Sequence, residues 1–334
     1  MSQILALLAR SLRHASKAVR PLCVSLIALL LASGAVRAEG LPILNLSVLQ
    51  FGTAHWELDH LQRHGLDRAH GFELKVRLVA DVPASRLAVT SGSADGAVSD
   101  VLWAQARHEA GTSYLFVPFS SQIGEVMVAE GSGIEHLAEL VGKRLGVAGG
   151  PDGQGWLLLQ RVAREQGIDL AQDARVQFGA PPLLAQALRR DQVDALLTFW
   201  HFAARMRGEG GVRTAFTMDQ LLGEAGLQPD LPVLGYLFPA SWAERNAELL
   251  QAFHHALRQA KEQLARQPDA WQAIRPLMRA EDDAVFLALR DSFVSGIPSP
   301  LDDAAIDSLY DLLLATGARR ERLMPAGLFH RISP

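Results

Sequence analysis

The stretch that decides the fold is "LSVLQFGTAHWELDHLQRHGLDRAHGFEL", which runs from Leu46 to Leu74. It opens with apolar strand residues, turns at Gly52, and continues with the helical pattern "HWELDHLQRHGLD", which ends near Gly65. It then leads into "FELKVRLV", which alternates like a strand. A strand, a helix and a second strand in this order are typical of a parallel sheet that is covered by helices.

The same alternation extends over most of the chain and predicts two α/β lobes. Residues 39–125 form the first part of lobe 1, and residues 126–232 form lobe 2. Residues 233–334 return to lobe 1 with the strand "LPVLGYLFP" and then become mostly helical, so we expect this helical part to pack on lobe 1. Two short connections therefore join the lobes as a two-strand hinge, and closure of such a hinge traps a ligand.

Residues 1–38 have a different composition. Four basic residues and no acidic residue precede the apolar run "PLCVSLIALLLASGA", and small residues lead up to Ala38. This pattern predicts a secretory signal peptide that is cleaved near Ala38, and hence a periplasmic location. An uncleaved membrane anchor is the alternative, although a membrane span needs about 20 apolar residues.

Composition fits a globular exported protein with real cores, since 49% of the residues are hydrophobic and 20% are charged. The sequence has a single cysteine, so an intramolecular disulfide is excluded. That residue, Cys23, lies in the predicted signal peptide. Removal of residues 1–38 takes five basic residues from the total of 32 and leaves 27 against 36 acidic residues, a net charge of −9. Nucleic acid is therefore not an expected partner. The sequence predicts no catalytic residue, no metal site and no cofactor.

Aromatic and polar residues gather at the predicted strand ends, where open α/β sheets bind their ligands. Four of the six tryptophans lie there, and an aromatic lining with a few polar groups is typical of small-molecule pockets. The predicted ligand-binding residues are Thr53, His55, Trp56, Ser99, Asp100, Ser120, Gly149, Gly150, Gln154, Trp156, Trp200, His201 and Tyr236.

Several of these residues have a structural alternative. Trp56 starts a helix and can pack in the core, and Asp100 or Ser99 is a suitable helix N-cap. His201 lies between aromatic residues that can belong to the core. The loop "GVAGGPDGQG" can offer backbone N–H groups to an anion, but it lacks the lysine and the spacing of nucleotide-binding loops.

The chain resembles the periplasmic solute-binding proteins of ABC importers, in the branch that serves nitrate, sulfonates, taurine and thiamine-precursor pyrimidines. The resemblance covers nearly all of the chain after residue 38. It is carried by the opening stretch and by "LAVTSGSADGAVSDVLWA", "LAELVGKRLGVAGG", "FGAPPLLAQALRRDQVDALLTFWHFAAR" and "SWAERNAELLQAFHHAL". It implies a type II periplasmic binding fold, a monomer, and ABC permease and ATPase partners. The binding positions that it implies are Thr53, Trp56, Ser99, Asp100, the loop 149–156, Trp200 and His201.

The charges at the strand ends indicate the kind of ligand. The strand-end loops hold Glu57, Asp100 and Asp152 beside aromatic residues and almost no Arg or Lys. A buried carboxylate beside a bare anion is costly. This pattern therefore favours a flat or cationic heterocycle or an amine that stacks on aromatic rings and forms a hydrogen bond with Asp100. The Gly149–Gly150 loop keeps a nitrate-, sulfonate- or taurine-type anion as an alternative.

Two other classes of function remain open. One is a periplasmic ligand-binding partner of a sensor or an oxidoreductase. The other is an enzyme like the related branch that makes the thiamine pyrimidine, which looks to use a cysteine-rich motif that this chain lacks after residue 38.

Overall fold

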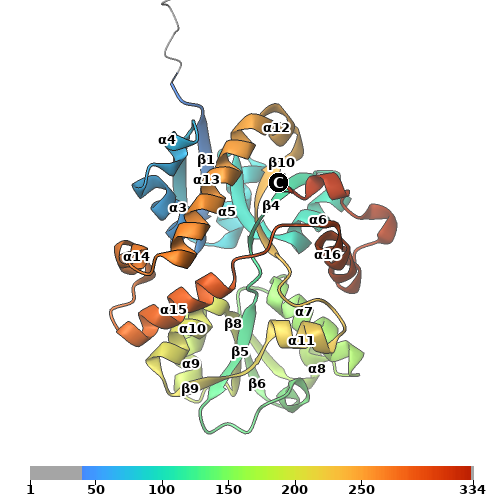
Figure 1. The fold of residues 1–334 in the computed structure, drawn as a ribbon. Coiled ribbons are helices and arrows are strands. Elements are labelled where there is room, and N and C mark those ends of the chain that lie inside the picture. Colours follow the sequence, from blue (N-terminus) through green and yellow to red (C-terminus); the bar gives the residue numbers. More distant parts are fainter. Residues whose placement is uncertain (1–39, 332–334) are drawn as a thin grey trace, which may run out of the picture. The chain divides into compact units, whose positions relative to one another are not determined.

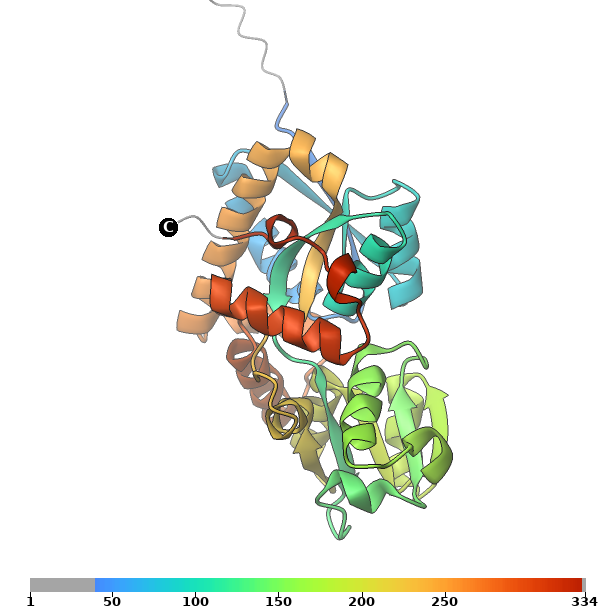
Figure 2. The same ribbon diagram turned by 90° about the vertical axis from the view of Figure 1, so that its right-hand side faces the viewer.

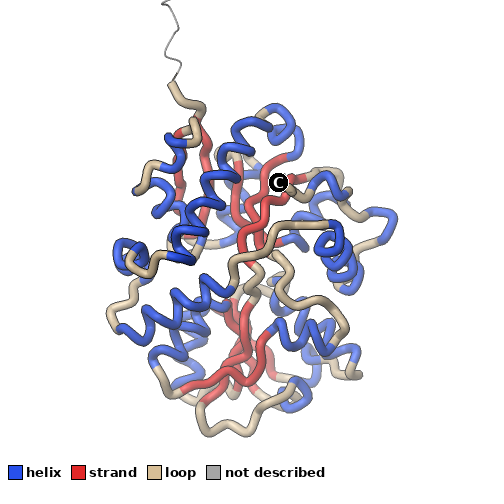
Figure 3. Tube along the Cα trace, viewed as in Figure 1, coloured by secondary structure: helices blue, strands red, loops and turns tan. Residues whose placement is uncertain are grey.

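Two five-stranded sheets organise the chain in the computed structural model, which describes residues 40–331. Helices lie on the faces of both sheets, which confirms the predicted α/β class (Figures 1 and 3). The predicted signal peptide, with Cys23 and the cleavage site at Ala38, lies outside the described residues. Among residues 40–331, the helices are all too short or too polar to cross a membrane.

The first sheet has the strand order β2-β1-β3-β10-β4. Strand β1 pairs in parallel with β2 and β3, whereas β10 is antiparallel to β3 and β4. We call this sheet and its helices the first lobe. Its elements up to β4, and the strand β10, are β1 (Ile43–Leu49), α3 (Ala54–Arg63), α4 (Leu66–Ala69), β2 (Glu73–Val79), α5 (Val82–Thr90), β3 (Gly96–Asp100), α6 (Val101–Glu109), β4 (Tyr114–Ser120) and β10 (Leu234–Pro239).

The second sheet has the order β7-β6-β8-β5-β9, with β6 parallel to β7 and β8 and with β5 antiparallel to β8 and β9. We call it and its helices the second lobe. Its elements are β5 (Gly124–Ala129), the 3-10 helix η1 (Leu137–Leu140), β6 (Arg144–Ala148), α7 (Gln154–Glu165), α8 (Leu170–Asp173), β7 (Arg175–Gly179), α9 (Pro181–Arg189), β8 (Ala195–Phe199), α10 (Trp200–Glu209), β9 (Val212–Thr217) and α11 (Met218–Glu224).

The opening stretch of sequence folds as a strand, helices and a strand. Side chains at Leu44, Leu46 and Val48 are fully buried and anchor β1 in the core. The predicted helix ends near Gly65, as expected, since α3 ends at Arg63. Gly65, with a φ of 61°, separates α3 from the short helix α4, which the sequence did not predict. Glycine adopts this left-handed conformation without strain, so the chain turns here before β2.

The chain after β10 is helical, as predicted. Helices α13 and α14 pack on α3 of the first lobe, whereas α15 packs along α10 of the second lobe (Figure 1). Figure 2 shows α16 lying across the first lobe. The elements are α12 (Ala240–Arg245), α13 (Ala247–Arg266), α14 (Ala270–Met278), α15 (Asp283–Ser295), α16 (Asp303–Ala315) and the 3-10 helices η2 (Arg320–Arg322) and η3 (Ala326–Leu328).

Helix α15 is the exception to the expectation that the C-terminal helices pack on lobe 1. Its close approach to α10 depends on Gly208, since a Cβ atom there would lie 2.6 Å from the Cα atom of Val285. The end of α15 reaches the connection between β4 and β5, where Ser121 donates its backbone N–H to the carbonyl oxygen of Gly296 at 3.1 Å. Helix α15 therefore contacts both the second lobe and the strand connection that leads into it.

Candidate functional site

Arg86 organises the strand end of β3. It comes from α5, and its Nε donates to Ser99 Oγ at 2.9 Å while its Nη2 donates to Asp100 Oδ2 at 2.7 Å. The other oxygen of Asp100 accepts the backbone N–H of Trp103 at 2.8 Å and caps α6. The Arg86 guanidinium carbon lies 5.3 Å from the centroid of the Trp103 ring. Both oxygens of Asp100 are thus occupied by residues of the first lobe.

Arg86 also faces the loop that follows β6 in the second lobe. Its Nη1 lies 3.8 Å from Asp152 Oδ2, and the Asp152 side chain is 82% exposed. The loop turns tightly there, with a φ of 91° at Gly149, and a Cβ atom at Gly150 would lie 2.8 Å from Asp152 Oδ1. The buried Nε2 of Gln154 has no hydrogen-bond partner within residues 40–331. Arg86 therefore lies between the strand end of β3 and the loop after β6, and we call this strand-end region the Arg86 site.

Arg86 is the member of this candidate site that the sequence did not predict. It lies in the middle of a helix and not in a strand-end loop. One signal was present in the sequence, because Arg86 is the only basic residue between Arg77 and Arg107. A buried carboxylate such as that of Asp100 needs a cation nearby, and Arg86 is the basic residue on the preceding helix.

Trp56 and Trp200 belong to one aromatic cluster. Trp56 from α3 and Trp200 from α10 meet edge to face with ring centroids 6.2 Å apart. Trp271 and Phe293 complete the cluster, at 6.4 Å and 6.0 Å from Trp56. Trp56 and Trp200 are only 4% and 3% exposed. These two predicted site residues are thus brought together, and they join the first lobe, α10 and α15 through packed rings.

Trp156 and His201 pack against aromatic rings of the second lobe. Trp156 is buried against Phe178 of β7, with centroids 5.8 Å apart. His201 lies in the first turn of α10, and its ring stacks on Phe199 with ring centroids 6.1 Å apart. Burial, with the nearby charge of Arg205, lowers the pKa of His201 to about 3. His201 is therefore a neutral ring at neutral pH.

Tyr236 belongs to a buried polar network behind β10. Its hydroxyl donates to Glu57 Oε1 at 2.7 Å, and the ammonium of Lys261 forms an ion pair with Glu57 Oε2. Lys261 also donates to the carbonyl oxygen of Phe119 at 2.9 Å. Burial raises the pKa of Glu57, an effect that Lys261 opposes, and the pKa of Tyr236 lies well above its ordinary value because of burial and the adjacent Glu57. The network ties α3 and α13 to β4 and β10.

The remaining predicted residues lie at strand ends of the first lobe. Thr53 is buried and accepts the backbone N–H of Trp56 at 3.1 Å through its carbonyl oxygen. His55 is half-buried in the first turn of α3. Ser120 is buried, and its hydroxyl accepts the backbone N–H of Gln122 at 3.1 Å. The ligand contacts predicted for these residues stay predictions.

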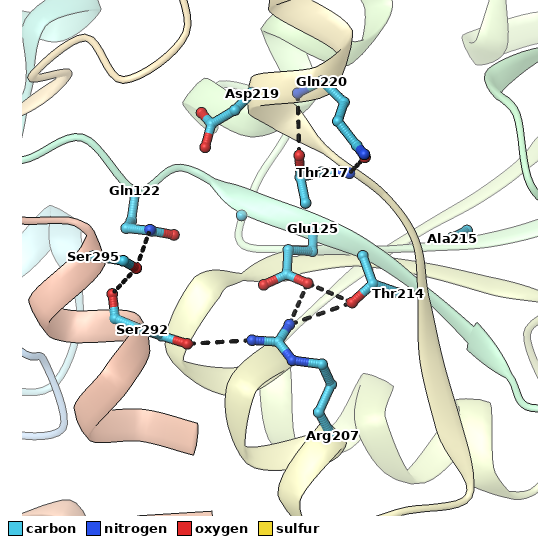
Figure 4. Close-up of a pocket in the computed structure, with 11 residues that line it drawn as sticks. Gln122, Glu125, Arg207, Thr214, Ala215, Thr217, Asp219, Gln220, Ser292 and Ser295 are labelled. Carbon is cyan, nitrogen blue, oxygen red and sulfur yellow. Dashed lines mark hydrogen bonds and ion pairs between the residues drawn. The ribbon is translucent and has the colours of Figure 1, made fainter. Parts of the chain in front are cut away.

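A separate cavity of about 470 Å³, which we call the α15 pocket, lies beside β5 (Figure 4). None of the predicted ligand-binding residues lines it. Its walls come from the β4–β5 connection, β5, β9, α10, α11 and α15. The lining residues are Gln122, Gly124, Glu125, Arg207, Thr214, Ala215, Thr217, Asp219, Gln220, Ser292 and Ser295.

An ion pair lies in the wall of the α15 pocket. Arg207 from α10 pairs with Glu125 Oε2 of β5, and Thr214 Oγ1 also donates to that oxygen at 2.5 Å. Arg207 Nη2 donates to Ser292 Oγ of α15 at 3.3 Å (Figure 4). The Asp219 side chain makes no hydrogen bond or ion pair within residues 40–331, and burial, Asp230 and Glu125 raise its pKa to about 6. The pocket therefore holds an unpartnered carboxyl group.

The raised pKa of Asp219 predicts a pH-dependent effect on stability. The folded state retains the Asp219 proton up to about pH 6, whereas the unfolded chain releases it near its ordinary pKa of 3.8. Folding stability therefore falls as the pH rises through this window, and the loss persists above it. We expect Asp219→Asn to melt at a higher temperature than the wild type at pH 7.5 and at a similar temperature at pH 4. An equal difference at both pH values would contradict the assignment.

The two five-stranded sheets and their strand order are those of the periplasmic binding protein fold, which comparison with known structures supports. The alkanesulfonate-binding protein SsuA of Xanthomonas axonopodis pv. citri, solved with bound MOPS, has a TM-score of 0.67 and 20% identity, over 88% of this chain and 100% of that one. The periplasmic aliphatic sulphonate-binding protein SsuA of Escherichia coli has a TM-score of 0.65 and 18% identity, over 85% and 98%.

A conserved Candida albicans protein with the generic periplasmic binding protein fold has a TM-score of 0.60 and 14% identity, over 86% and 94% of the two chains. The family model described as NMT1/THI5 like matches residues 62–271. The chain belongs to this NMT1/THI5-like family. The comparison with curated proteins gives no match.

Proposed function

We propose that the protein is an exported solute-binding protein, which captures a small molecule at the Arg86 site and delivers it to an ABC importer. The observation that carries this proposal is the position of Arg86. It is fixed by Ser99 and Asp100 at the strand ends of one lobe and faces Asp152 at the strand ends of the other. A ligand held there contacts both lobes, as solute capture by hinge closure requires.

We propose further that the ligand carries an anionic group. Arg86 uses two nitrogens on Ser99 and Asp100, and its Nη1 is the open donor, since 3.8 Å to Asp152 is too long for a hydrogen bond. The unpartnered Nε2 of Gln154 is a second donor. A carboxylate or sulfonate matches these donors, and the alkanesulfonate- and sulphonate-binding neighbours support this class.

The flat or cationic ligand favoured by the sequence loses its main contact in this arrangement. Its expected partner was Asp100, whose two oxygens already accept from Arg86 and from the Trp103 backbone. A zwitterion remains compatible, because its cationic end can face the exposed Asp152 carboxylate. An amine or a pyrimidine without an anionic group is the alternative that the test below separates.

The test is a thermal-shift and calorimetric screen of the purified protein. The panel holds alkanesulfonates, taurine, nitrate, bicarbonate, small aromatic acids, pyrimidines and amines. A ligand at 100 times its dissociation constant stabilises the fold by about 2.7 kcal/mol, which raises the melting temperature by several degrees. We expect the hits to be anions or zwitterions. Hits confined to pyrimidines and simple amines would contradict the anionic class.

Two variants and a control locate the binding. Arg86→Gln removes a charge-assisted contact and is expected to weaken anion binding about tenfold or more. Asp152→Asn removes a carboxylate that competes for Arg86. The affinity for an anion should therefore stay the same or rise, and the affinity for a cationic ligand should fall. Arg77→Gln makes the same chemical change on an exposed strand residue and should leave binding unchanged. Equal affinities for Arg86→Gln and Arg77→Gln would place the ligand elsewhere.

We propose a permease and an ATPase as partners, a periplasmic location and a monomeric state. The neighbours are described as binding proteins, which supports binding over catalysis. Turnover of any hit from the screen would favour an enzyme. An ABC importer can be reconstituted from permease and ATPase genes that neighbour the gene of this protein. If the protein binds the ligand but does not stimulate transport by that importer, a sensor or an oxidoreductase is favoured as the partner.

A further inference from the structure

The α15 pocket is separate from the Arg86 site, and no residue of the Arg86 site lines it. Its volume of about 470 Å³ falls within the range of small-molecule sites. Its walls include residues of the second sheet, of the connection between β4 and β5, and of α15 in the C-terminal helical part of the chain. Gln122 in that connection donates from its Nε2 to Ser295 Oγ of α15 at 3.3 Å. An occupant of this pocket therefore touches three segments that are far apart in sequence (Figure 4).

The lining has an excess of negative charge. It contains two carboxyl groups, Glu125 and Asp219, and one cation, Arg207. The Arg207 guanidinium is committed to Glu125, Thr214 and Ser292. The Asp219 carboxylate has no such partner within the described residues, and it lies at the pocket wall opposite Glu125 in Figure 4.

The open hydrogen-bonding groups are mainly acceptors. The two oxygens of Asp219 and Glu125 Oε1 accept no hydrogen bond from residues 40–331, because both contacts of Glu125 fall on its Oε2. The hydroxyl of Thr217 and the side-chain oxygen of Gln220 are already used in the capping of α11. A ligand that fits this lining must bring positive charge and several N–H donors, which a primary ammonium group does.

We propose that the α15 pocket binds a small organic cation of the primary ammonium class, with the ammonium group between Asp219 and Glu125 Oε1. The polar remainder of the cavity holds the rest of the molecule against Gln122, Thr217 and Ser295. This proposal does not rest on the proposed function, because the two sites share no residue. The α15 pocket is then a second ligand-binding site, and it lies where α15 contacts the β4–β5 connection.

The probe for the test is 1,4-diaminobutane, titrated by calorimetry into the purified full-length protein at low ionic strength. We expect saturable binding. The neutral isostere 1,4-butanediol and the anion succinate should not bind at this site. Calcium chloride tests whether the acidic lining holds a metal ion instead, and binding of Ca²⁺ in competition with the diamine at higher affinity would overturn the assignment to an organic cation.

Matched variants assign the binding to the pocket. Asp219→Asn should weaken diamine binding about tenfold or more, because it removes the charged acceptor. Glu224→Gln removes the same charge from an exposed position on the same helix, outside the pocket, and should change binding little. Equal affinities in the two variants, or the absence of saturable binding to the wild type, would overturn the proposal.

A measurement on the wild type keeps the test independent of any variant that fails to fold. Hydrogen exchange should slow at residues 217–220 and 292–296 when the diamine is added, because these segments border the pocket. Residues 86–103 at the Arg86 site should show no change. Slowing that is confined to residues 86–103 would show that the diamine binds at the other site and would contradict the proposal.

Discussion

Lys261→Met is expected to destabilise the fold by about 3–5 kcal/mol at pH 7.5, because it leaves Glu57 as an unpaired buried charge. The Glu57 side chain is fully buried, and its ion pair with Lys261 offsets the burial that raises its pKa. Without Lys261 that pKa rises further. The penalty should therefore be small near pH 4.5, where Glu57 is protonated, and should grow with pH. Urea unfolding at several pH values measures it.

A double variant and a surface control separate the buried charge from lost packing. Glu57→Gln in the Lys261→Met background removes the unpaired charge and should recover most of the lost stability at pH 7.5. Lys75→Met removes a lysine whose nearest carboxylate, on Glu73, lies 3.9 Å away in an exposed pair. It should cost less than about 1 kcal/mol. If the double variant is as unstable as Lys261→Met, the loss comes from packing or from the Phe119 contact.

Gly208→Ala is expected to lower the melting temperature by about 5 °C or more, which corresponds to about 2–3 kcal/mol of overpacking. The added Cβ atom would lie 2.6 Å from the Cα atom and 2.8 Å from the backbone nitrogen of Val285. Backbone atoms cannot rotate out of the way as side chains do, so α15 must move away from α10. Differential scanning calorimetry checks the expected loss.

Gly223→Ala is the matched control for this helix–helix contact. Gly223 also lies inside a helix, α11, and a Cβ atom there meets nothing within 4 Å. Because alanine favours helix over glycine by about 1 kcal/mol, this variant should be neutral or more stable. A similar response of both variants would mean that α15 does not depend on the close contact at Gly208.

Local pattern predicted most of the secondary structure, because strand and helix periods are properties of neighbouring residues. The predicted strands "FELKVRLV" and "LPVLGYLFP" correspond to β2 and β10, which begin one and three residues later than predicted. The end of α3 near Gly65 was predicted, whereas the short helix α4 was not, because a single helical turn is too short to show a helical period in the apolar pattern.

The candidate site was predicted in part. Ser99, Asp100 and the loop that contains Gly149, Gly150 and Gln154 lie at strand ends around Arg86, as a parallel sheet requires. Trp56 and Trp200 come from first helical turns and Tyr236 from within β10, and their side chains are buried in the aromatic cluster and the Glu57 network. Sequence position fixes the end of a strand, and it does not fix the direction in which a long side chain packs.

The sequence by itself determined the α/β class, the order of the elements and the loops that carry polar groups, because these follow from periodicity and from turn residues. Only the tertiary structure decided that Arg86 forms an ion pair with Asp100, that the Trp56 ring contacts the Trp200 ring and that α15 packs on α10. The physical reason is that each of these contacts joins residues from different elements. Their distances depend on how helices pack on sheets and on the space that a residue such as Gly208 leaves open.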